Sequence, residues 1–283
     1  MTVVRVSGPD DPRVDGYRSV ADPELVRQRG LFVAEGRLVV ERLIADGRFV
    51  VQSVLLSDAA RRAMEPTLAA LPVHVPVYVC AAAALRGVTG YDVHRGCLAL
   101  AARPAALDAD EVLREARLVV VLDGVTNADN VGGVFRNAAA FGAHAVLLDH
   151  GSCDPLYRKA IRTSMAAVLR VPFARLAVQA SEWPAAIAGL RSRGFQLVAL
   201  TTACSARDLD EYASTATSDR VALLLGGEGF GLSAASLSAA DDQVRIPISR
   251  HVDSLNLAVA AGIALHAIAG RRRGQQRKEQ LAE

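Results

Sequence analysis

Polar side chains that could bind or activate a substrate follow an apolar run in the segment DGVTNADNVGGVFRNAAAFG, residues 123–142. The run before it, 118–122, predicts a buried strand, and open α/β sheets bind ligands where their strands end. Asn130 lies near the predicted start of a helix, where it could contact a ligand or only cap the helix. Arg136 is expected to be half-buried among small apolar residues. It therefore needs an anionic partner, which could be a structural carboxylate.

A second candidate is the glycine-rich segment LLLGGEGFGL, residues 223–232, in which four glycines surround Glu228. Glycines allow positive φ and close backbone approach, so this loop could present main-chain amides to a ligand. Gly227, Gly229 and Gly231 do not match the G-x-G-x-x-G dinucleotide fingerprint, and the segment lacks the Gly-Lys-Ser/Thr of a P-loop. Glu228 could also simply cap a helix or pair with an arginine.

A third candidate begins with the predicted strand 244–248 and continues through a loop to Ser254, Leu255 and Asn256. Ser254 is predicted to be the N-cap of a last helix that runs to about Gly270, and a catalytic role is compatible with that position. His251 is expected to be a solvated loop residue.

Composition sets the broad class of protein. A chain of 283 residues predicts two domains, and 51% hydrophobic with 22% charged residues excludes wholesale disorder. The apolar runs are far shorter than the roughly 20 residues that cross a bilayer, and the N-terminus lacks a secretory pattern, so we expect a cytoplasmic protein without a membrane segment. A net charge of +2 does not by itself indicate nucleic-acid binding. The cysteines and histidines lack metal-ligand spacing, which predicts no metal.

Two α/β regions must position these candidates, and residues 103–117 between them are predicted to be a linker or a short helix. The first region is a small α/β domain, with strands predicted at 50–56, 73–79 and 97–101 and helices at 36–45 and 58–70. In the second, the alternation of strands and helices predicts a parallel sheet with helices on both faces. Its strands are predicted at 118–122, 143–148, 196–200, 221–225 and 244–248.

The three candidate segments together resemble the three motifs of the SpoU-type, or TrmH-like, RNA ribose methyltransferases of the SPOUT superfamily. Motif one is similar to Asn130-x-Gly132-x-x-x-Arg136 with Phe141-Gly142, motif two to Gly226-Gly227-Glu228-Gly229-x-Gly231, and motif three to Ile246-Pro247 with Ser254-Leu255-Asn256. The segment Phe32 to Gly36 resembles the start of the family's small substrate-binding domain. The segment Lys159 to Ser164 also resembles a family segment, in which Ala166 stands where a glycine is more usual.

The resemblance implies an α/β fold in two parts. A small ribosomal-protein-like substrate-binding domain would span 1–105, a linker 106–117, a knotted SPOUT methyltransferase domain 118–270, and a polar tail 271–283. The C-terminal chain would thread a deep trefoil knot through the parallel sheet and form the pocket for S-adenosylmethionine. The cofactor-binding residues implied are Leu200, Thr201, Gly226, Gly227, Ile246, Ile248 and Leu255, whose types suit an adenine ring and a thioether stem.

The chemistry implied is attack of a ribose 2′-hydroxyl of structured RNA on the sulfonium methyl, with ribosomal RNA favoured over transfer RNA. Arg136 is the family's counterpart for activating the hydroxyl, and since a guanidinium stays protonated it is expected to clamp a phosphate rather than act as a general base. Asn130, Glu228, Ser254 and Asn256 would orient the reacting groups. The resemblance also implies a homodimer whose sites draw residues from both chains.

Two other functions stay open at this point. One is a catalytically inactive RNA-binding protein of the same fold, against which the presence of all five catalytic residues argues. The other is a nucleotide-dependent oxidoreductase, which the failed dinucleotide fingerprint disfavours.

Overall fold

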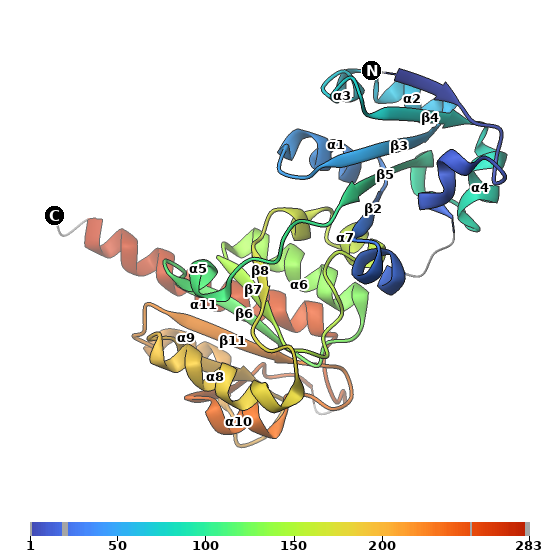
Figure 1. Ribbon diagram of the computed structural model, residues 1–283. Helices are drawn as coiled ribbons and strands as arrows, with labels where there is room; N and C mark the ends of the chain where they lie inside the picture. Colours follow the sequence, from blue (N-terminus) through green and yellow to red (C-terminus); the bar gives the residue numbers. More distant parts are fainter. Residues whose placement is uncertain (1, 19–21, 250, 281–283) are drawn as a thin grey trace. The chain divides into compact units, whose positions relative to one another are not determined.

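The computed structural model describes residues 2–18, 22–249 and 251–280 and divides the chain into two compact units (Figure 1). The first comprises Met1–Ala105 and Asp154–Leu169, and the second comprises Ala106–Cys153 and Arg170–Glu283. Residues 154–169 were expected in the second domain but fold with the first. The reason is that α7 (Arg158–Thr163) packs against β2 (Leu31–Glu35).

Within its described residues, the first unit contains a mixed five-stranded sheet in the order β1-β4-β3-β5-β2. Strands β1, β4 and β3 are parallel, and β5 runs antiparallel to both β3 and β2. The predicted strands 50–56 and 97–101 are confirmed within one residue. The bounds are β1 Thr2–Arg5, β3 Val51–Ser57, β4 Pro76–Cys80 and β5 Cys97–Ala102.

The helices of the first unit are short. The predicted helix 36–45 is confirmed as α1 (Arg37–Asp46), whereas 58–70 forms two helices, since Pro66 lies in the first turn of the second. The others are α2 Asp58–Ala63, α3 Glu65–Leu68 and α4 Ala82–Thr89, with short turns of helix at Pro12–Tyr17, Glu24–Gln28, His94–Gly96 and Ala167–Leu169.

The second unit contains, within its described residues, a seven-stranded sheet in the order β10-β12-β9-β11-β6-β7-β8. Every pair of neighbouring strands is parallel, which confirms the predicted sheet. The central strands are buried because helices cover both faces. The bounds are β6 Leu118–Asp123, β7 Ala145–Leu148, β8 Phe173–Arg175, β9 Gln196–Leu200, β10 Arg207–Asp208, β11 Val221–Gly226 and β12 Asp242–Arg245.

Helices α5, α8 and α10 pack on one face of this sheet, around Trp183, Ile187 and Leu190. On the other face α6 packs on α11, which also contacts α9 (Figure 1). The bounds are α5 Ala109–Leu113, α6 Ala128–Phe141, α8 Trp183–Ser192, α9 Leu209–Thr215, α10 Ala234–Ala239 and α11 Leu257–Gln280, with a 3-10 turn at Ala180–Glu182.

Residues 103–117, predicted to be a linker or a short helix, contain the short helix α5, and Leu113 and Ala116 are buried in the core of the second unit. One segment differs from its predicted role. Residues 271–280 continue α11 instead of forming a separate tail. Their arginines, glutamines, lysine and glutamate are strong helix formers, so the helix extends past Gly270.

Candidate active site

The residues predicted to bind a cofactor lie where neighbouring strands β12, β9 and β11 end. Leu200 and Gly226 are the last residues of β9 and β11, and Ile246 follows the last residue of β12. The sheet hydrogen bonding continues one step further, since the Thr201 amide donates to the Val244 carbonyl at 2.9 Å. All seven predicted residues are only half-buried, so this edge is partly open: Leu200, Thr201, Gly226, Gly227, Ile246, Ile248 and Leu255.

The glycine loop after β11 folds back on itself. A Cβ at Gly226 would lie 2.1 Å from the carbonyl carbon of Gly231 and 2.2 Å from the Leu232 nitrogen. A Cβ at Gly227 would lie 2.2 Å from the Gly124 carbonyl oxygen. Gly229 and Gly231 have φ of +86° and +69°, which favours glycine. Gly226 is therefore required by the loop's own backbone, and a side chain there would displace the loop before it reached a ligand.

Asp123 anchors the far end of this loop, a role that was not predicted from the sequence. Its side chain is 7% exposed, and Oδ2 accepts from the Ser233 amide at 2.8 Å and from the Ser236 hydroxyl at 2.6 Å. Ser236 in turn accepts a hydrogen bond from Trp183 Nε1 at 3.1 Å. An acid at the end of a buried strand was the signal available in the sequence, but its partners are more than 100 residues away.

Helices α6 and α11 approach closely because their contact residues are small. A Cβ at Gly133 would lie only 2.4 Å from the Cβ of Ala258. Beside this contact, Asn137 Nδ2 donates to the Ala258 carbonyl at 2.6 Å. The contact fixes the first turn of α11 against the first half of α6.

That approach brings one polar residue from each of the three motifs together. Asn256 Nδ2 donates to Asn130 Oδ1 at 2.9 Å and lies 3.5 Å from Glu228 Oε1. Asn130 is 2% exposed, and its own Nδ2 is buried without a hydrogen-bond acceptor in the part of the chain that the structure describes. A buried donor without an acceptor is costly, so this nitrogen indicates a place for an acceptor from a bound molecule.

Both helix caps differ from the predicted alternatives. Asn127, not Asn130, caps α6, and its Oδ1 accepts from the Asp129 amide at 2.8 Å. Asn256, not Ser254, caps α11, with Oδ1 accepting from the amides of Ala258 at 3.0 Å and Val259 at 3.4 Å. Ser254 is exposed in the preceding loop, as is His251. The structure thus does not place Ser254 among the clustered polar residues.

Arg136 is exposed on α6, and the prediction that it is half-buried is wrong. Its neighbours Phe135 and Ala138 are buried, but the helix turns Arg136 away from them. No ion pair joins Arg136 to an acid within the described residues. Within residues 2–18, 22–249 and 251–280, Arg136 therefore takes part in no structural salt bridge.

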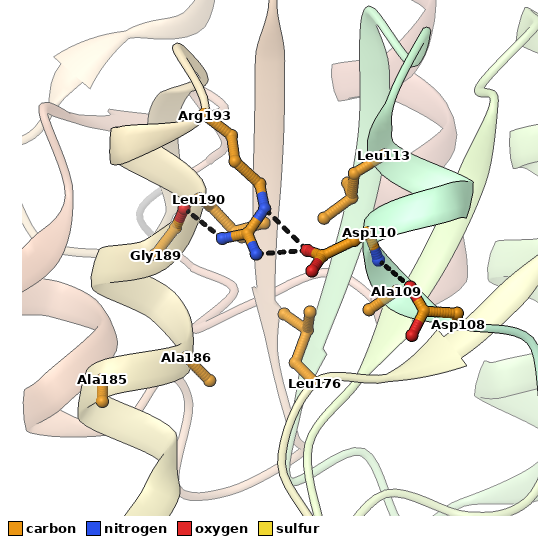
Figure 2. Close-up of a pocket in the computed structure, with 10 residues that line it drawn as sticks. All are labelled: Asp108, Ala109, Asp110, Leu113, Leu176, Ala185, Ala186, Gly189, Leu190 and Arg193. Atoms are coloured by element: carbon orange, nitrogen blue, oxygen red, sulfur yellow. Dashed lines mark hydrogen bonds and ion pairs between the residues drawn. The ribbon is translucent and has the colours of Figure 1, made fainter.

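A cavity of about 330 Å³ lies between α5 and α8 of the second unit. Figure 2 shows the residues that line it. Arg193 crosses it, donating from Nε to Asp110 Oδ1 at 3.0 Å and from a terminal nitrogen to the Gly189 carbonyl at 2.7 Å. Leu113 and Arg193 precede β6 and β9, so the cavity lies toward the amino ends of the strands. None of the predicted site residues lines it.

The described residues offer neither a metal site nor a membrane span. In residues 2–18, 22–249 and 251–280, no cluster of three or more histidine, cysteine or acidic side chains could hold a metal ion. Over the same part of the chain, no helix combines the length and the apolar character needed to cross a membrane.

Comparisons with known proteins match both the sequence and the fold. The model of the SpoU rRNA Methylase family matches residues 117–266, more than half of the chain. This chain belongs to that family of RNA methyltransferases. A relative from Mycobacterium tuberculosis, described as an uncharacterized tRNA/rRNA methyltransferase, is 40% identical over 270 residues, covering 94% of this chain and 91% of the relative.

Solved structures are similar over both units. An AdoMet-bound rRNA methyltransferase from Sinorhizobium meliloti has a TM-score of 0.79 and 25% identity, covering 95% of this chain and 98% of that one. An RNA 2′-O ribose methyltransferase has a TM-score of 0.75 and 27% identity, covering 95% and 99%. The resemblance seen in the three motifs is thus confirmed, as is the α/β fold with its parallel sheet.

Proposed function

We propose that this protein transfers a methyl group from S-adenosylmethionine to a ribose 2′-hydroxyl of structured RNA, with ribosomal RNA favoured over transfer RNA. The observation that carries the proposal is the cluster of Asn130, Glu228 and Asn256, in which a buried Asn130 amide has no acceptor among the described residues. The AdoMet-bound rRNA methyltransferase and the RNA 2′-O ribose methyltransferase that share this fold support the same reaction.

The strand ends suit S-adenosylmethionine, which supplies, when bound, an electrophilic methyl group for attack by the ribose oxygen. Leu200, Ile246, Ile248 and Leu255 offer half-buried apolar surface for the adenine ring and the thioether stem. The close-packed backbone at Gly226 and Gly227 offers main-chain groups without side chains in the way. In the knotted arrangement that we expect for the C-terminal chain, these loops would enclose the cofactor.

The polar cluster would hold the ribose in place. Asn256 is fixed at both ends, since Oδ1 caps α11 and Nδ2 faces Asn130 and Glu228. Asn130 Nδ2 is then free to donate to an oxygen of the RNA. Ser254, exposed in the loop before α11, would add a hydroxyl contact once RNA is bound.

Arg136 would bind the phosphate next to the target nucleotide. Its exposed guanidinium can stabilise the alkoxide that develops on the ribose oxygen, while the proton passes to that phosphate or to water. This is electrostatic stabilisation rather than general-base catalysis.

We further propose that a homodimer completes the site. Arg136 lies six residues after Asn130, which on a helix places it about 9 Å along the axis and about 120° around it. Arg136 and Asn130 therefore point in different directions on α6, and an Arg136 side chain from a second copy could reach the cluster. The exposed apolar residues Val259 and Ile263, one turn apart on α11, support such an interface. A cytoplasmic location stays a prediction.

The decisive experiment measures methyl transfer to RNA from cells that lack the gene, with the products identified as 2′-O-methylated nucleosides by mass spectrometry. Arg136→Ala should lower turnover on the order of a hundredfold, and Arg136→Lys by less, because lysine keeps the charge but loses the planar fork. Both should keep the affinity for S-adenosylmethionine, and the free energy of unfolding should change by less than about 0.5 kcal/mol, as for exposed residues in general.

Arg114→Ala, which removes another exposed arginine of the second unit, serves as the matched control. Near-normal turnover in Arg136→Ala would refute the phosphate clamp. Cofactor binding without any transfer by the wild-type protein would instead favour the inactive RNA-binding protein.

A further inference from the structure

A second cavity, of about 550 Å³, lies within the first unit and contains no residue that the proposed reaction uses. We call it the arginine cavity. Its volume lies within the roughly 300–1,000 Å³ of small-molecule sites. Three separate segments line it. The junction of β2 and α1 contributes Glu35, Arg37 and Leu38, the turn before β5 contributes Arg95, and the end of α7 contributes Arg162 and Met165. Residues 154–169 thus complete a site in the unit with which they fold.

The charges around the arginine cavity leave an excess of positive charge. Glu35 is 2% exposed, and its carboxylate lies 3.8 Å from the guanidinium nitrogens of both Arg158 and Arg162. Glu41 also lines the cavity, so the lining carries two carboxylates, Glu35 and Glu41, against three arginines, Arg37, Arg95 and Arg162. Within the part of the chain that the structure describes, neither Arg37 nor Arg95 has an ion pair. An anionic ligand would pair with these two guanidinium groups.

Unfavourable backbone conformations gather at the same place. Among the described residues, the non-glycine residues with positive φ are Arg95 (56°), Met165 (52°) and Ala166 (66°). Two of these line the cavity, and the third follows directly. The left-handed conformation costs a non-glycine residue roughly 1–2 kcal/mol, and such strain is typical of ligand sites.

We propose that the arginine cavity binds one unpaired nucleotide of the RNA substrate, with its phosphate between Arg37 and Arg95 and its base against Leu38 and Met165. Forked guanidinium groups match phosphate oxygens, and unpaired RNA bases bind to apolar side chains and arginine planes. The combination of arginines with apolar walls suits a nucleotide better than an acidic peptide. The inference rests on the proposed function in taking RNA as the substrate, and it gives the first unit a defined contact with that RNA.

The test compares full-length Arg37→Ala, Arg95→Ala and Leu38→Glu with Arg62→Ala, which removes an exposed arginine of α2 outside the cavity. The probe is RNA extracted from cells that lack the gene, used in filter binding at several salt concentrations and in methyl transfer. Each arginine variant should bind this RNA about tenfold more weakly and raise KM to a similar extent, with kcat nearly unchanged. The log-log salt slope should fall by about 0.7 for each single-strand phosphate that is no longer neutralised by an arginine.

Leu38→Glu separates a binding defect from a folding defect. An acid in the first turn of α1 favours the helix, so the melting temperature should not fall, yet the new charge should repel a phosphate. Arg62→Ala should behave as the wild type. Wild-type affinity in the three cavity variants would overturn the proposal and favour a protein ligand for the cavity. An equal loss of affinity in Arg62→Ala would also overturn it, because RNA would then bind through general charge attraction.

The same measurements keep the two proposals apart. If the wild-type protein binds the RNA but methylates no ribose, the proposed function fails while the binding comparison still decides the role of the cavity. If the wild-type protein does not bind the RNA at all, the cavity proposal fails as well.

Discussion

The close contact of α6 with α11 makes a precise prediction at Gly133. Gly133→Ala adds a methyl group 2.4 Å from the Ala258 Cβ, whereas carbon atoms prefer a separation of about 3.5–4.0 Å. Neither methyl can rotate away, because each is attached directly to its helix backbone. The two helices must therefore move apart by more than about 1 Å at this point.

The expected effect on stability is small because two contributions oppose each other. Overpacking of this kind costs about 1–3 kcal/mol, while replacing glycine by alanine inside a helix contributes about 1 kcal/mol in the other direction. The effect on the site should be larger, since the Asn256–Asn130 hydrogen bond of 2.9 Å lies next to this contact. A displacement of about 1 Å can lower turnover on the order of a hundredfold. Gly133→Ala should thus cause a large loss of turnover with only a small change in the melting temperature.

The assay measures turnover, affinity for S-adenosylmethionine and urea unfolding in Gly133→Ala, Ala258→Gly and the double variant. Moving the methyl group from one helix to the other restores the space, so the double variant should regain most of the turnover that Gly133→Ala removes. In the double variant, the gain in helix propensity from Gly133→Ala and the loss from Ala258→Gly should nearly cancel in the free energy of unfolding. Full turnover in Gly133→Ala, or no recovery in the double variant, would show that helix spacing does not set the geometry of the site.

Three further outcomes are expected. Gly226→Ala should lower the melting temperature and the cofactor affinity together, because its Cβ would overlap the Gly231 backbone; calorimetry showing normal affinity at an unchanged melting temperature would contradict this. Asn256→Asp should keep the α11 cap but replace the donor that faces Asn130 and Glu228 by a carboxylate, so the free energy of unfolding should decrease and turnover should fall on the order of a hundredfold; wild-type turnover would remove this amide from the mechanism. Cys204 alone should react with iodoacetamide in the folded protein, as counted by mass spectrometry, since the other cysteines are buried and burial raises the pKa of two of them.

Much of the second unit could be predicted because its central strands are continuous apolar runs. The strands β6, β9 and β11 lie within one residue of their predicted bounds. The last predicted strand, 244–248, was placed too late, since β12 ends at Arg245. Ile246 and Ile248 resemble strand residues, but they lie half-buried beyond the last pairing with β9. Apolar residues that lie half-buried beyond the end of a strand cannot be distinguished from core residues by periodicity alone.

The division into units could not be predicted from the order of the sequence. Residues 154–169 contain buried apolar residues such as Ile161 and Leu169, which fit either unit equally well on composition. Arg48 donates to the Leu169 carbonyl at 2.7 Å, a contact within the first unit that no local pattern shows. A fragment that begins near Val112 would therefore expose a segment whose partners lie in the missing part, and it would not isolate the second unit.

The helix caps could not be assigned from the sequence alone. Asn127 and Asn130 can each cap the start of α6, and Ser254 and Asn256 can each cap the start of α11. Local propensity does not choose within either pair. The choice is made by the α6–α11 contact, which buries Asn130 and leaves Asn127 at the helix start. Gly133 and Asp123 were missed for the same reason, because their partners come from remote parts of the chain.

Asn256 links this tertiary contact to the proposed chemistry. Its oxygen accepts from the first amides of α11 and its nitrogen donates to Asn130, so the start of the helix and the orientation of the site amide are set by one side chain. Because the oxygen is committed to the cap, the nitrogen must face Asn130, which turns the Asn130 oxygen inward and leaves its Nδ2 as the unpaired buried donor among the described residues. The unpaired donor thus follows from how α11 begins. In the function that we propose, helix packing would consequently determine where a substrate oxygen is bound.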